Sequence, residues 1–222
     1  MRQNVIAAAV ITATSLLGAN LALAEDSPFS GNVTFVSDYV SRGYSWSDGR
    51  PAIQGSIDYN HASGLYAGLW GSSVAKNSVI EGSNGVELDV YIGYAGEIGA
   101  FGFDVGAVRY IYPGSHKSDD TDSTELYLGA SWEFLSLTYY RDIDFDTNYL
   151  EFEVAYPLNE SLTLDASIGY LDPDDGKSAR NWKLGVTQSF VGLDFGLHYV
   201  DSNVKNTPNY DKALVLSISK SF

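Results

Sequence analysis

Apolar and polar residues alternate without interruption in residues 86–94, which read VELDVYIGY. One set consists of Val86, Leu88, Val90, Ile92 and Tyr94, and the other of Glu87, Asp89, Tyr91 and Gly93. Successive side chains of a β-strand point to opposite faces. The pattern therefore predicts a strand with one apolar face and one polar face.

The same alternation recurs toward both ends of the chain. It is found in residues 53–59, 125–132, 150–156, 162–170, 182–189 and 193–199. Two segments are less regular, because residues 64–75 are apolar on both faces and Arg109 shares the apolar face of residues 102–112. A charge facing lipid at mid-depth costs a few kcal/mol, so we expect Arg109 to reach the membrane surface or to turn inward.

Twelve strands account for the whole pattern. Their expected bounds are 32–43, 51–60, 64–75, 86–96, 101–112, 124–133, 135–142, 148–157, 161–171, 181–190, 192–201 and 212–222. Short turns alternate with longer polar loops, and no linker marks a second domain. An even strand number with this loop pattern is typical of a bacterial transmembrane barrel. The predicted fold is all-β, a single antiparallel up-and-down β-barrel of about 12 strands.

A soluble β-protein would alternate as well, but its apolar faces would pack inward beneath a charged surface. The membrane barrel is favoured because the polar faces are rich in Gly, Ser, Thr and carboxylates, while the apolar faces are aliphatic in the middle and aromatic at the ends. The expected aromatic girdles contain Tyr94, Trp132, Phe134, Tyr156, Phe190 and Phe222 at one end, and Tyr170, Trp182 and Tyr199 at the other. Closure of the barrel pairs every strand edge, as backbone in lipid requires.

Both ends of the sequence indicate export to the outer membrane. Arg2 precedes an Ala-rich apolar run that ends in Ala22-Leu23-Ala24, a small-x-small cleavage pattern. We expect residues 1–24 to be a cleaved signal peptide and residues 25–222 to form the barrel. Residues 212–222 finish on Phe222 and resemble the outer-membrane insertion signal read by the barrel-assembly machinery, although Lys220 replaces the usual apolar residue.

The composition excludes several other classes of protein. The 222 residues contain no cysteine and have a formal net charge of −15, from 13 Lys and Arg against 28 Asp and Glu. Nucleic-acid binding requires clustered basic residues, and disulfides or thiolate metal sites require cysteine. The apolar fraction of 45% also separates the chain from acidic disordered proteins.

Several short segments carry a family likeness. Residues 37–45 read SDYVSRGYS and residues 48–52 read DGRPA; residues 64–72 read GLYAGLWGS and residues 112–114 read YPG. From about Gly31 onward the chain resembles the TorF-type porin family, although Ser41 stands where an aromatic residue is expected. The resemblance implies an outer-membrane barrel of porin type. It implies no substrate, because the cargo of that family is largely unassigned.

With a periplasmic N-terminus, the inward polar faces form two acidic belts. The outer belt contains Glu87, Asp89, Glu125, Glu151 and Glu153, and the inner belt contains Asp58, Asp104, Asp165 and Asp194. The expected counter-charges are Arg42, Lys183 and His198, and Asp38 completes the lumen-lining candidates. A low-dielectric wall lined by one sign of charge enriches counter-ions. The sequence predicts a porin-like channel for passive diffusion of small polar solutes that favours cations or neutral molecules.

Other interpretations stay open. The carboxylates could instead pair with Arg42 and Lys183 and close the barrel, since twelve strands lie between filled barrels and wide channels. A closed structural or adhesion barrel is therefore the main alternative, and an enzyme that modifies outer-membrane lipids is a weaker one. The three histidines are His61 in a turn, His116 in a loop and His198 on a strand, and nothing local marks a serine nucleophile for His198.

Metal binding has one weak signal. Asp142, Asp144 and Asp146 begin like a calcium loop, but Thr147 replaces the required glycine. Acidic loops at 119–122 and 172–176 favour a solvated surface, with weak divalent-cation bridging to lipopolysaccharide as the second interpretation. We predict no resident metal and no cofactor, and we expect outer-membrane lipids, lipopolysaccharide and small solutes as partners. Inside the barrel, Tyr91 and Tyr127 are expected to lie over neighbouring glycines.

Overall fold

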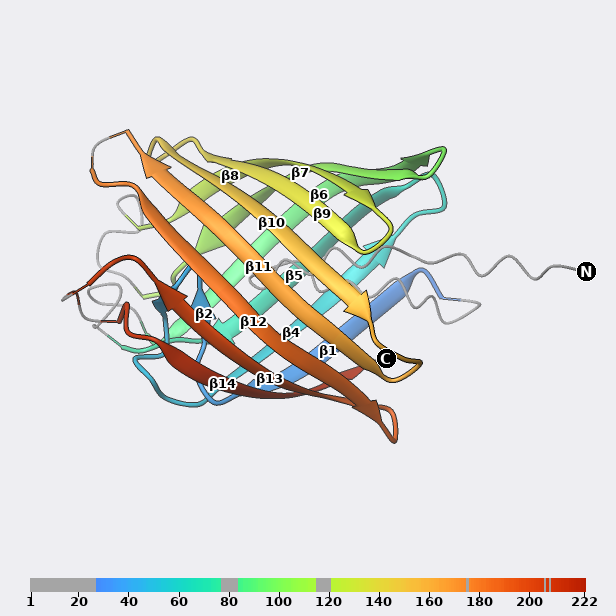
Figure 1. Cartoon of the computed structure of the whole chain (residues 1–222). Coiled ribbons are helices and arrows are strands. Elements are labelled where there is room, and N and C mark those ends of the chain that lie inside the picture. The colour runs from blue at the N-terminus through green and yellow to red at the C-terminus, as the bar shows by residue number, and fades with distance from the viewer. Residues whose placement is uncertain (1–26, 77–83, 115–120, 175, 206, 208) are drawn as a thin grey trace, which may run out of the picture.

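A closed antiparallel barrel of twelve strands forms the molecule (Figure 1). The computed structural model describes residues 27–76, 84–114, 121–174, 176–205, 207 and 209–222, so the expected signal peptide, residues 1–24, lies outside the described residues. The wall strands are β1 (Phe29–Val36), β4 (Ala52–Asn60), β5 (Leu65–Ser73), β6 (Val86–Ile98), β7 (Phe101–Ile111), β8 (Ser123–Trp132), β9 (Leu135–Asp142), β10 (Thr147–Pro157), β11 (Leu162–Pro173), β12 (Ala179–Phe190), β13 (Leu193–Ser202) and β14 (Ala213–Ser221). No helix among the described residues is long and apolar enough to cross a membrane.

Each wall strand pairs with its neighbours in sequence, and β1 pairs with β14 to close the ring. Phe222 continues this seam, because its backbone N–H donates to Gly31 O at 3.0 Å and its carbonyl accepts from Gly31 N at 2.9 Å. The predicted all-β, up-and-down barrel of twelve strands is therefore confirmed. Tight turns lie at one end of the barrel and longer connections at the other (Figure 1).

The bounds of the first strand were predicted wrongly. A continuous strand over 32–43 was expected, but β1 ends at Val36 and a separate hairpin follows, made of β2 (Val40–Ser41) and β3 (Tyr44–Ser45). Arg42 and Gly43 form its two-residue turn with φ angles of 52° and 78°. Positive φ at both turn residues is the geometry of a type I′ hairpin turn, and this backbone cannot continue a strand.

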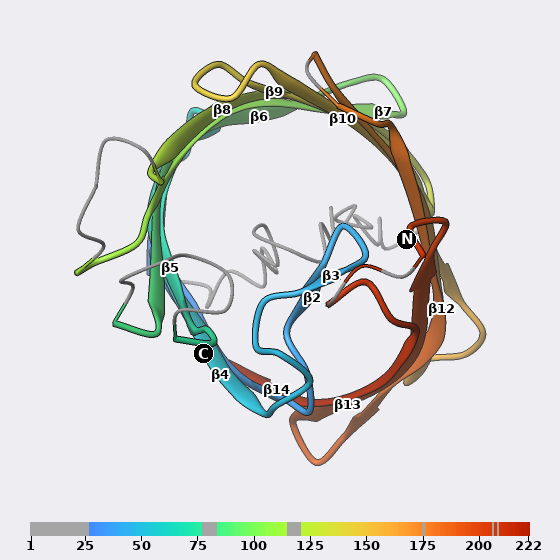
Figure 2. The same ribbon diagram turned by 90° about the vertical axis from the view of Figure 1, so that its left-hand side faces the viewer.

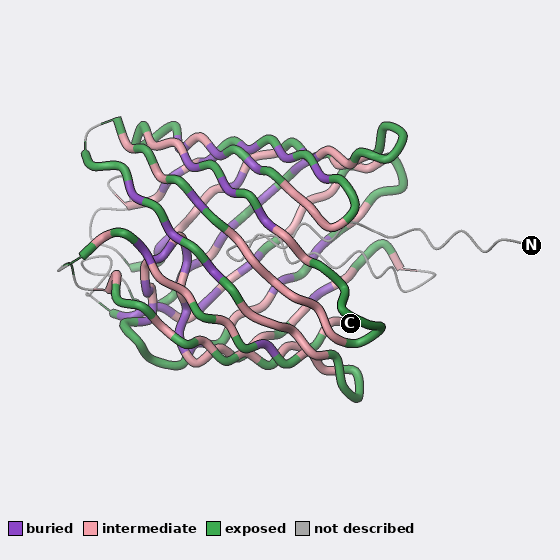
Figure 3. The backbone as a smooth tube through the Cα atoms, viewed as in Figure 1, coloured by how far each residue is buried: buried purple, intermediate pink, exposed green. Residues whose placement is uncertain are grey.

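The two faces of the wall are inverted relative to a soluble β-protein, with apolar side chains exposed and polar ones buried. Ile57 and Ile92 are each 62% exposed, whereas Glu87 and Glu125 are each 2% exposed. Buried and exposed positions alternate along the strands in Figure 3. All the expected girdle residues but Phe134, which is only partly exposed, are exposed: Tyr94, Trp132, Tyr156, Phe190 and Phe222 at the turn end, and Tyr170, Trp182 and Tyr199 at the loop end.

Arg109 and Lys220 are among the basic side chains on the outer face of the wall, and each reaches an end of the barrel. Arg109 is near the loop end of β7, where Nη1 donates to Thr124 Oγ1 at 2.9 Å and to Asp144 Oδ2 at 2.8 Å. Its parity does not flip, and the guanidinium reaches the surface loop instead. Lys220 is at the turn end and donates to the Gly192 carbonyl at 2.9 Å.

Candidate functional site

The β2–β3 hairpin lies inside the ring of strands, as Figure 2 shows in the view along the barrel. Its tip contacts β12 and β13, because a Cβ atom on Gly43 would lie 2.8 Å from Asn181 Cβ and 3.0 Å from Ser202 Cβ. Glycine at this turn is therefore required both by the backbone conformation and by the close approach of the wall. The segment with the family likeness thus enters the barrel instead of extending its wall.

Arg42, beside Gly43, binds the wall opposite β1. Its guanidinium donates two hydrogen bonds to the Glu125 carboxylate on β8, at 2.5 and 2.7 Å. It also lies 5.0 Å from the ring centre of Tyr140 and 4.4 Å from that of Tyr149. Charge-assisted bidentate pairing and cation–π contact both favour a fixed orientation of the guanidinium. The hairpin therefore crosses the interior and is fastened on the opposite side.

The base of the hairpin is packed by four aromatic residues, Tyr39, Trp46, Trp70 and Tyr112, which we call the hairpin aromatic cluster. Trp46 stacks on Tyr112 with ring centres 5.9 Å apart, and Tyr39 lies 5.6 Å from Trp70. Tyr39, Trp70 and Tyr112 are all less than 10% exposed. Aromatic pairs of this kind contribute roughly 0.5–1.5 kcal/mol each beyond burial. The cluster holds the hairpin base against β5 and the end of β7.

Asp38 braces the hairpin rather than facing open space. Its Oδ1 accepts hydrogen bonds from Ser45 Oγ at 2.6 Å and from Ser47 Oγ at 2.8 Å, and the side chain is 9% exposed. The Ser45 backbone N–H also donates to the Asn209 carbonyl at 2.8 Å. These contacts tie both arms of the hairpin together and to the loop before β14.

The outer acidic belt lies on the wall that the hairpin covers. Its members are all 5% exposed or less: Glu87, Asp89, Glu125, Glu151 and Glu153. Tyr112 donates to Glu87 Oε1 at 3.2 Å, and Lys183 Nζ lies 4.0 Å from Glu153 Oε1. Glu87 Oε2, Glu153 Oε1 and both Asp89 carboxylate oxygens accept no hydrogen bond within the described part of the chain.

Two loop tyrosines stay protonated beside this belt. The pKa of the Tyr39 and Tyr112 phenols is raised well above its ordinary value. Burial is the largest cause, and the negative charge of Glu87 is the second. A phenol that keeps its proton is a donor, which suits Tyr112 to its contact with Glu87.

The inner acidic belt is satisfied by hydroxyl groups. Asp58 accepts from Tyr91 and Ser56, and Asp104 accepts from Tyr66 at 2.6 Å. Thr187 donates to Asp165 Oδ2 at 2.6 Å, with His198 Nε2 3.1 Å from the same oxygen, and Ser189 donates to Asp194 at 2.5 Å. Every carboxylate of this belt therefore has a partner on the wall itself.

Glycines on the inward face provide room for the tyrosines that reach these carboxylates. Asp58, Gly68 and Tyr91 are in register on β4, β5 and β6, so the Tyr91 ring crosses Gly68 to reach Asp58. In the same way, the hydroxyls of Tyr66 and Tyr127 meet at 2.5 Å above Gly93 and Gly106. The expected placement of Tyr91 and Tyr127 over glycines is confirmed.

The sequence interpretation missed several inward aromatic residues: Tyr39, Trp46, Tyr66, Trp70, Tyr110, Tyr140 and Tyr149. For Tyr66 and Trp70 a signal was available, because residues 64–75 are apolar on both faces and an aromatic residue at inward parity can fill the space above a glycine. Tyr110 donates to Glu125 Oε2 at 2.7 Å, which alternation alone could not indicate.

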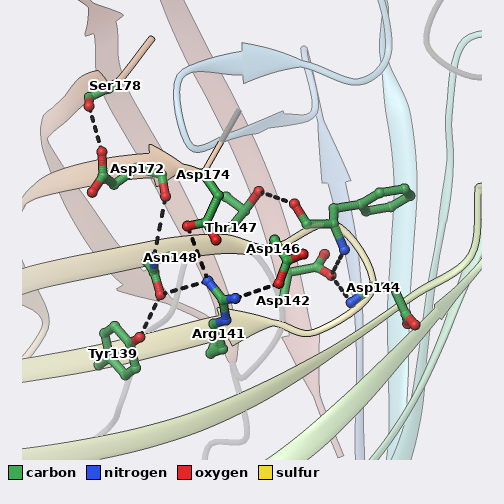
Figure 4. Close-up of polar contacts among 11 residues, drawn as sticks. Tyr139, Arg141, Asp142, Asp144, Asp146, Thr147, Asn148, Asp172, Asp174 and Ser178 are labelled. Carbon is green, nitrogen blue, oxygen red and sulfur yellow. Dashed lines mark hydrogen bonds and ion pairs between the residues drawn. The ribbon is translucent and has the colours of Figure 1, made fainter. Parts of the chain in front are cut away.

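The calcium-like segment forms a paired surface loop instead (Figure 4). Asp142 Oδ1 accepts from the backbone N–H groups of Asp144 and Phe145, both at 2.9 Å. Asp146 pairs with Arg141 at 2.5 Å, and Asp144 pairs with Arg109. The carboxylates therefore already have protein partners. Of the other acidic loops named above, residues 119, 120 and 175 lie outside the described residues.

The histidines are the candidate side chains for catalysis or metal binding. His198 pairs with Asp165, His61 Nδ1 lies 2.8 Å from Ser63 Oγ, and His116 lies outside the described residues. In the part of the chain that the structure covers, no three His, Asp or Glu side chains are grouped so as to hold a metal ion. The main feature of the interior is an acidic inner face, together with one hairpin that crosses the lumen and is held there by the Arg42–Glu125 pair.

A family model described as "Bacterial protein of unknown function (Gcw_chp)" matches residues 23–222. The chain belongs to the Gcw_chp family. No curated protein matches the sequence.

Solved structures resemble this member of the Gcw_chp family in fold. A KdgM porin superposes with a TM-score of 0.61 at 9% identity, covering 87% of this chain and 98% of that one. A NanC porin gives a TM-score of 0.56 at 11% identity, over 86% and 97% of the two chains. The outer membrane protein Omp33 of Acinetobacter baumannii gives 0.53 at 9% identity, over 88% and 98%. At these identities the likeness establishes the fold, a porin-like barrel of the same size.

Proposed function

We propose that this protein is an outer-membrane, porin-like channel for the passive diffusion of small polar solutes, with a preference for cations or neutral molecules over anions. The observation that carries the proposal is the charge of the inward face. The thirteen lumen-lining candidates comprise ten carboxylates, two permanent cations and His198. A lining of one sign enriches counter-ions and repels ions of the same sign.

The exposed apolar wall and its aromatic ends support the outer membrane as the location. A second structure similar in fold, with a TM-score of 0.62 and 12% identity, is a KdgM porin in complex with disordered oligogalacturonate. That ligand is a chain of sugar acids. The acidic interior of the present barrel suggests the opposite charge preference, so we do not extend that substrate to it. We do infer that small solutes pass through this barrel, and we propose that the protein belongs with TorF-type porins.

A closed barrel is the second candidate, and the hairpin is the observation that favours it. Arg42 and Glu125 fasten a folded segment across the interior, and the aromatic cluster seals its base. The inward residues of the periplasmic half on β11, β12 and β14, such as Asp165, Thr187 and Ser217, are by contrast only half-buried. The narrowest part of any path would therefore lie beside the hairpin.

Planar-bilayer recordings with the purified protein under a salt gradient test the proposal. We expect a stable conductance and a reversal potential of cation-selective sign. An anion-selective sign would contradict the acidic lining. No conductance in the wild type, together with conductance in Arg42→Ala, would instead identify a barrel closed by the hairpin.

We also propose that the protein is exported to the outer membrane. We propose that residues 1–24 are removed and that the strand ending at Phe222 is recognised by the barrel-assembly machinery. Mass spectrometry of the protein from outer-membrane fractions should give a chain that starts at Glu25. Deletion of Phe222 should reduce the amount assembled, because the Gly31–Phe222 backbone pair at the seam is lost.

A further inference from the structure

Two buried carboxylates lie behind the hairpin aromatic cluster with fewer partners than a pair of buried charges requires. Asp89 is 0% exposed and neither of its side-chain oxygens accepts a hydrogen bond within the described residues. Glu87 is 2% exposed, and its Oε2 is likewise without a hydrogen-bond partner there. Removing a carboxylate from water costs several kcal/mol unless charges or hydrogen bonds compensate. The Tyr39 and Tyr112 phenols hydrogen-bond Glu87, whereas both Asp89 oxygens have no donor among the described residues.

The two side chains share one place in the wall. Glu87 and Asp89 are two residues apart on β6, so they are on the same face with Cα atoms roughly 7 Å apart. Asp89 is in register with Trp70 on β5 and with Tyr110 on β7. Tyr39 and Tyr112 approach from the hairpin base and from the end of β7. The carboxylates are therefore enclosed by aromatic side chains.

The nearby guanidinium gives its hydrogen bonds to a third carboxylate. Arg42 directs both terminal nitrogens to Glu125, whose Oε2 also accepts from Tyr110. One positive charge thus faces three carboxylates of the outer belt, Glu87, Asp89 and Glu125. After the Arg42–Glu125 pair is formed, two negative charges remain without compensation on this part of the wall.

We propose that Glu87 and Asp89 bind a small inorganic cation, which neutralises the pair and holds the hairpin base against β6. Carboxylate and phenol oxygens are hard ligands that suit alkali and alkaline-earth ions. A divalent ion such as Ca²⁺ matches the charge of the pair. Because the described residues bring no third Asp, Glu or His to this place, tyrosine hydroxyls and water complete the ligand shell.

The proposal does not depend on ion conduction, because a closed barrel would bury the same two charges. Purified wild-type protein in detergent is treated with EDTA, exchanged into N-methyl-D-glucamine buffer and titrated with CaCl₂ by isothermal calorimetry. We expect one site per chain, and an unfolding temperature that rises with Ca²⁺, since a ligand that binds only the folded state stabilises it. Titrations with MgCl₂, NaCl and KCl identify which cation the site prefers.

Three variants locate the site. Asp89→Asn and Glu87→Gln should each weaken binding at least tenfold and remove the effect of the cation on the unfolding temperature. Asp194→Asn should keep the binding affinity and the effect of the cation on the unfolding temperature, because Asp194 has its own donor, Ser189, at the inner end of the barrel. Heat-modifiable migration on gels reports whether each variant is folded, and Glu87→Gln keeps the test valid if Asp89→Asn does not assemble.

Two outcomes overturn the proposal. One is the absence of binding by all four cations, with an unfolding temperature that falls as pH rises, which would mean that a shared proton neutralises the pair. The other is cation binding that is equal in the wild type and in Asp89→Asn, which would place it on the surface loops. A shift produced by Na⁺ or K⁺ alone and lost in Asp89→Asn supports the site with a monovalent ion.

Discussion

The two acidic belts both consist of inward-facing carboxylates, yet these carboxylates are held in different ways. The inner belt is held by hydroxyl groups from neighbouring wall strands, as in Tyr91 with Asp58 and Tyr66 with Asp104. The outer belt adds charge pairing to its tyrosine donors, with Arg42 on Glu125 and Lys183 near Glu153, and among the described residues Asp89 has no hydrogen-bond partner. The difference arises because a hairpin covers the outer belt and excludes water from it. Strand parity decides which way a carboxylate points, but the covering segment decides what can neutralise it.

The largest effect is expected from Arg42→Ala. Removing one partner of a buried ion pair leaves an uncompensated charge and typically costs roughly 3–5 kcal/mol. We expect the hairpin to detach from Glu125, with a lower unfolding temperature, a larger conductance and stronger cation selectivity in bilayers.

The matched control for this change is the double variant Arg42→Gln with Glu125→Gln, which removes both charges. It should recover part of the stability while keeping the larger conductance. If Arg42→Ala alone leaves both stability and conductance as in the wild type, the outer belt is not held by charge, and the contrast between the belts fails.

Gly68→Ala tests the inner belt. A Cβ atom at residue 68 would lie 2.5 Å from the Tyr91 ring and hydroxyl, so the ring must move away from Asp58. Inserting a methyl group into packed space costs about 1–3 kcal/mol. Gly129→Ala is the control, since its nearest neighbour, Thr138 Oγ1, is 3.3 Å away. Thermal unfolding should separate the two variants, and equal values would mean that the tyrosines over glycines do not stabilise the barrel.

Tyr66→Phe removes a hydroxyl group without changing the packing. The Tyr66 hydroxyl donates to Asp104 and contacts the Tyr127 hydroxyl, so its loss leaves a buried carboxylate with one donor fewer. We expect a loss of about 1–2 kcal/mol in stability and little change in conductance. Tyr94→Phe, on the exposed outer face, should have no measurable effect. A shifted reversal potential with an unchanged unfolding temperature would show that this tyrosine lines the path instead of only supporting Asp104.

The amount that could be predicted from sequence differs between wall and interior for a physical reason. Alternation with period two indicates the face of most wall residues, so the barrel and most of the exposed girdles follow from local pattern. The hairpin does not follow, because its turn needs a positive φ at Arg42, a residue with no special preference for it. Its partner Glu125 is 83 residues away in sequence. Nothing in the sequence near Arg42 indicates that these two side chains form an ion pair.

The same limit applies to individual site residues. The inward direction of Asp89 could be predicted from its neighbours Leu88 and Val90, but its lack of a partner depends on three separate segments that meet only in the folded barrel. Asp38 was expected to line the lumen, and its position in the hairpin gives it two serine donors instead. Sequence pattern gives orientation within a strand, whereas contacts between segments require the fold.

The smallest effect is expected from Asp194→Asn, at the inner mouth. This carboxylate is half-buried and bonded to Ser189, so its loss should change stability by less than about 1 kcal/mol. Its charge still faces the entrance, where screening by salt is effective, with a Debye length of about 10 Å at 0.1 M and about 3 Å at 1 M. We therefore expect a modest fall in cation selectivity at low salt that disappears near 1 M. Selectivity changes caused by Arg42→Ala should persist at high salt, because the outer belt is screened less by the surrounding solution. Equal salt dependence of the two variants, measured as reversal potentials over the same series, would remove the distinction between a solvated inner belt and a covered outer one.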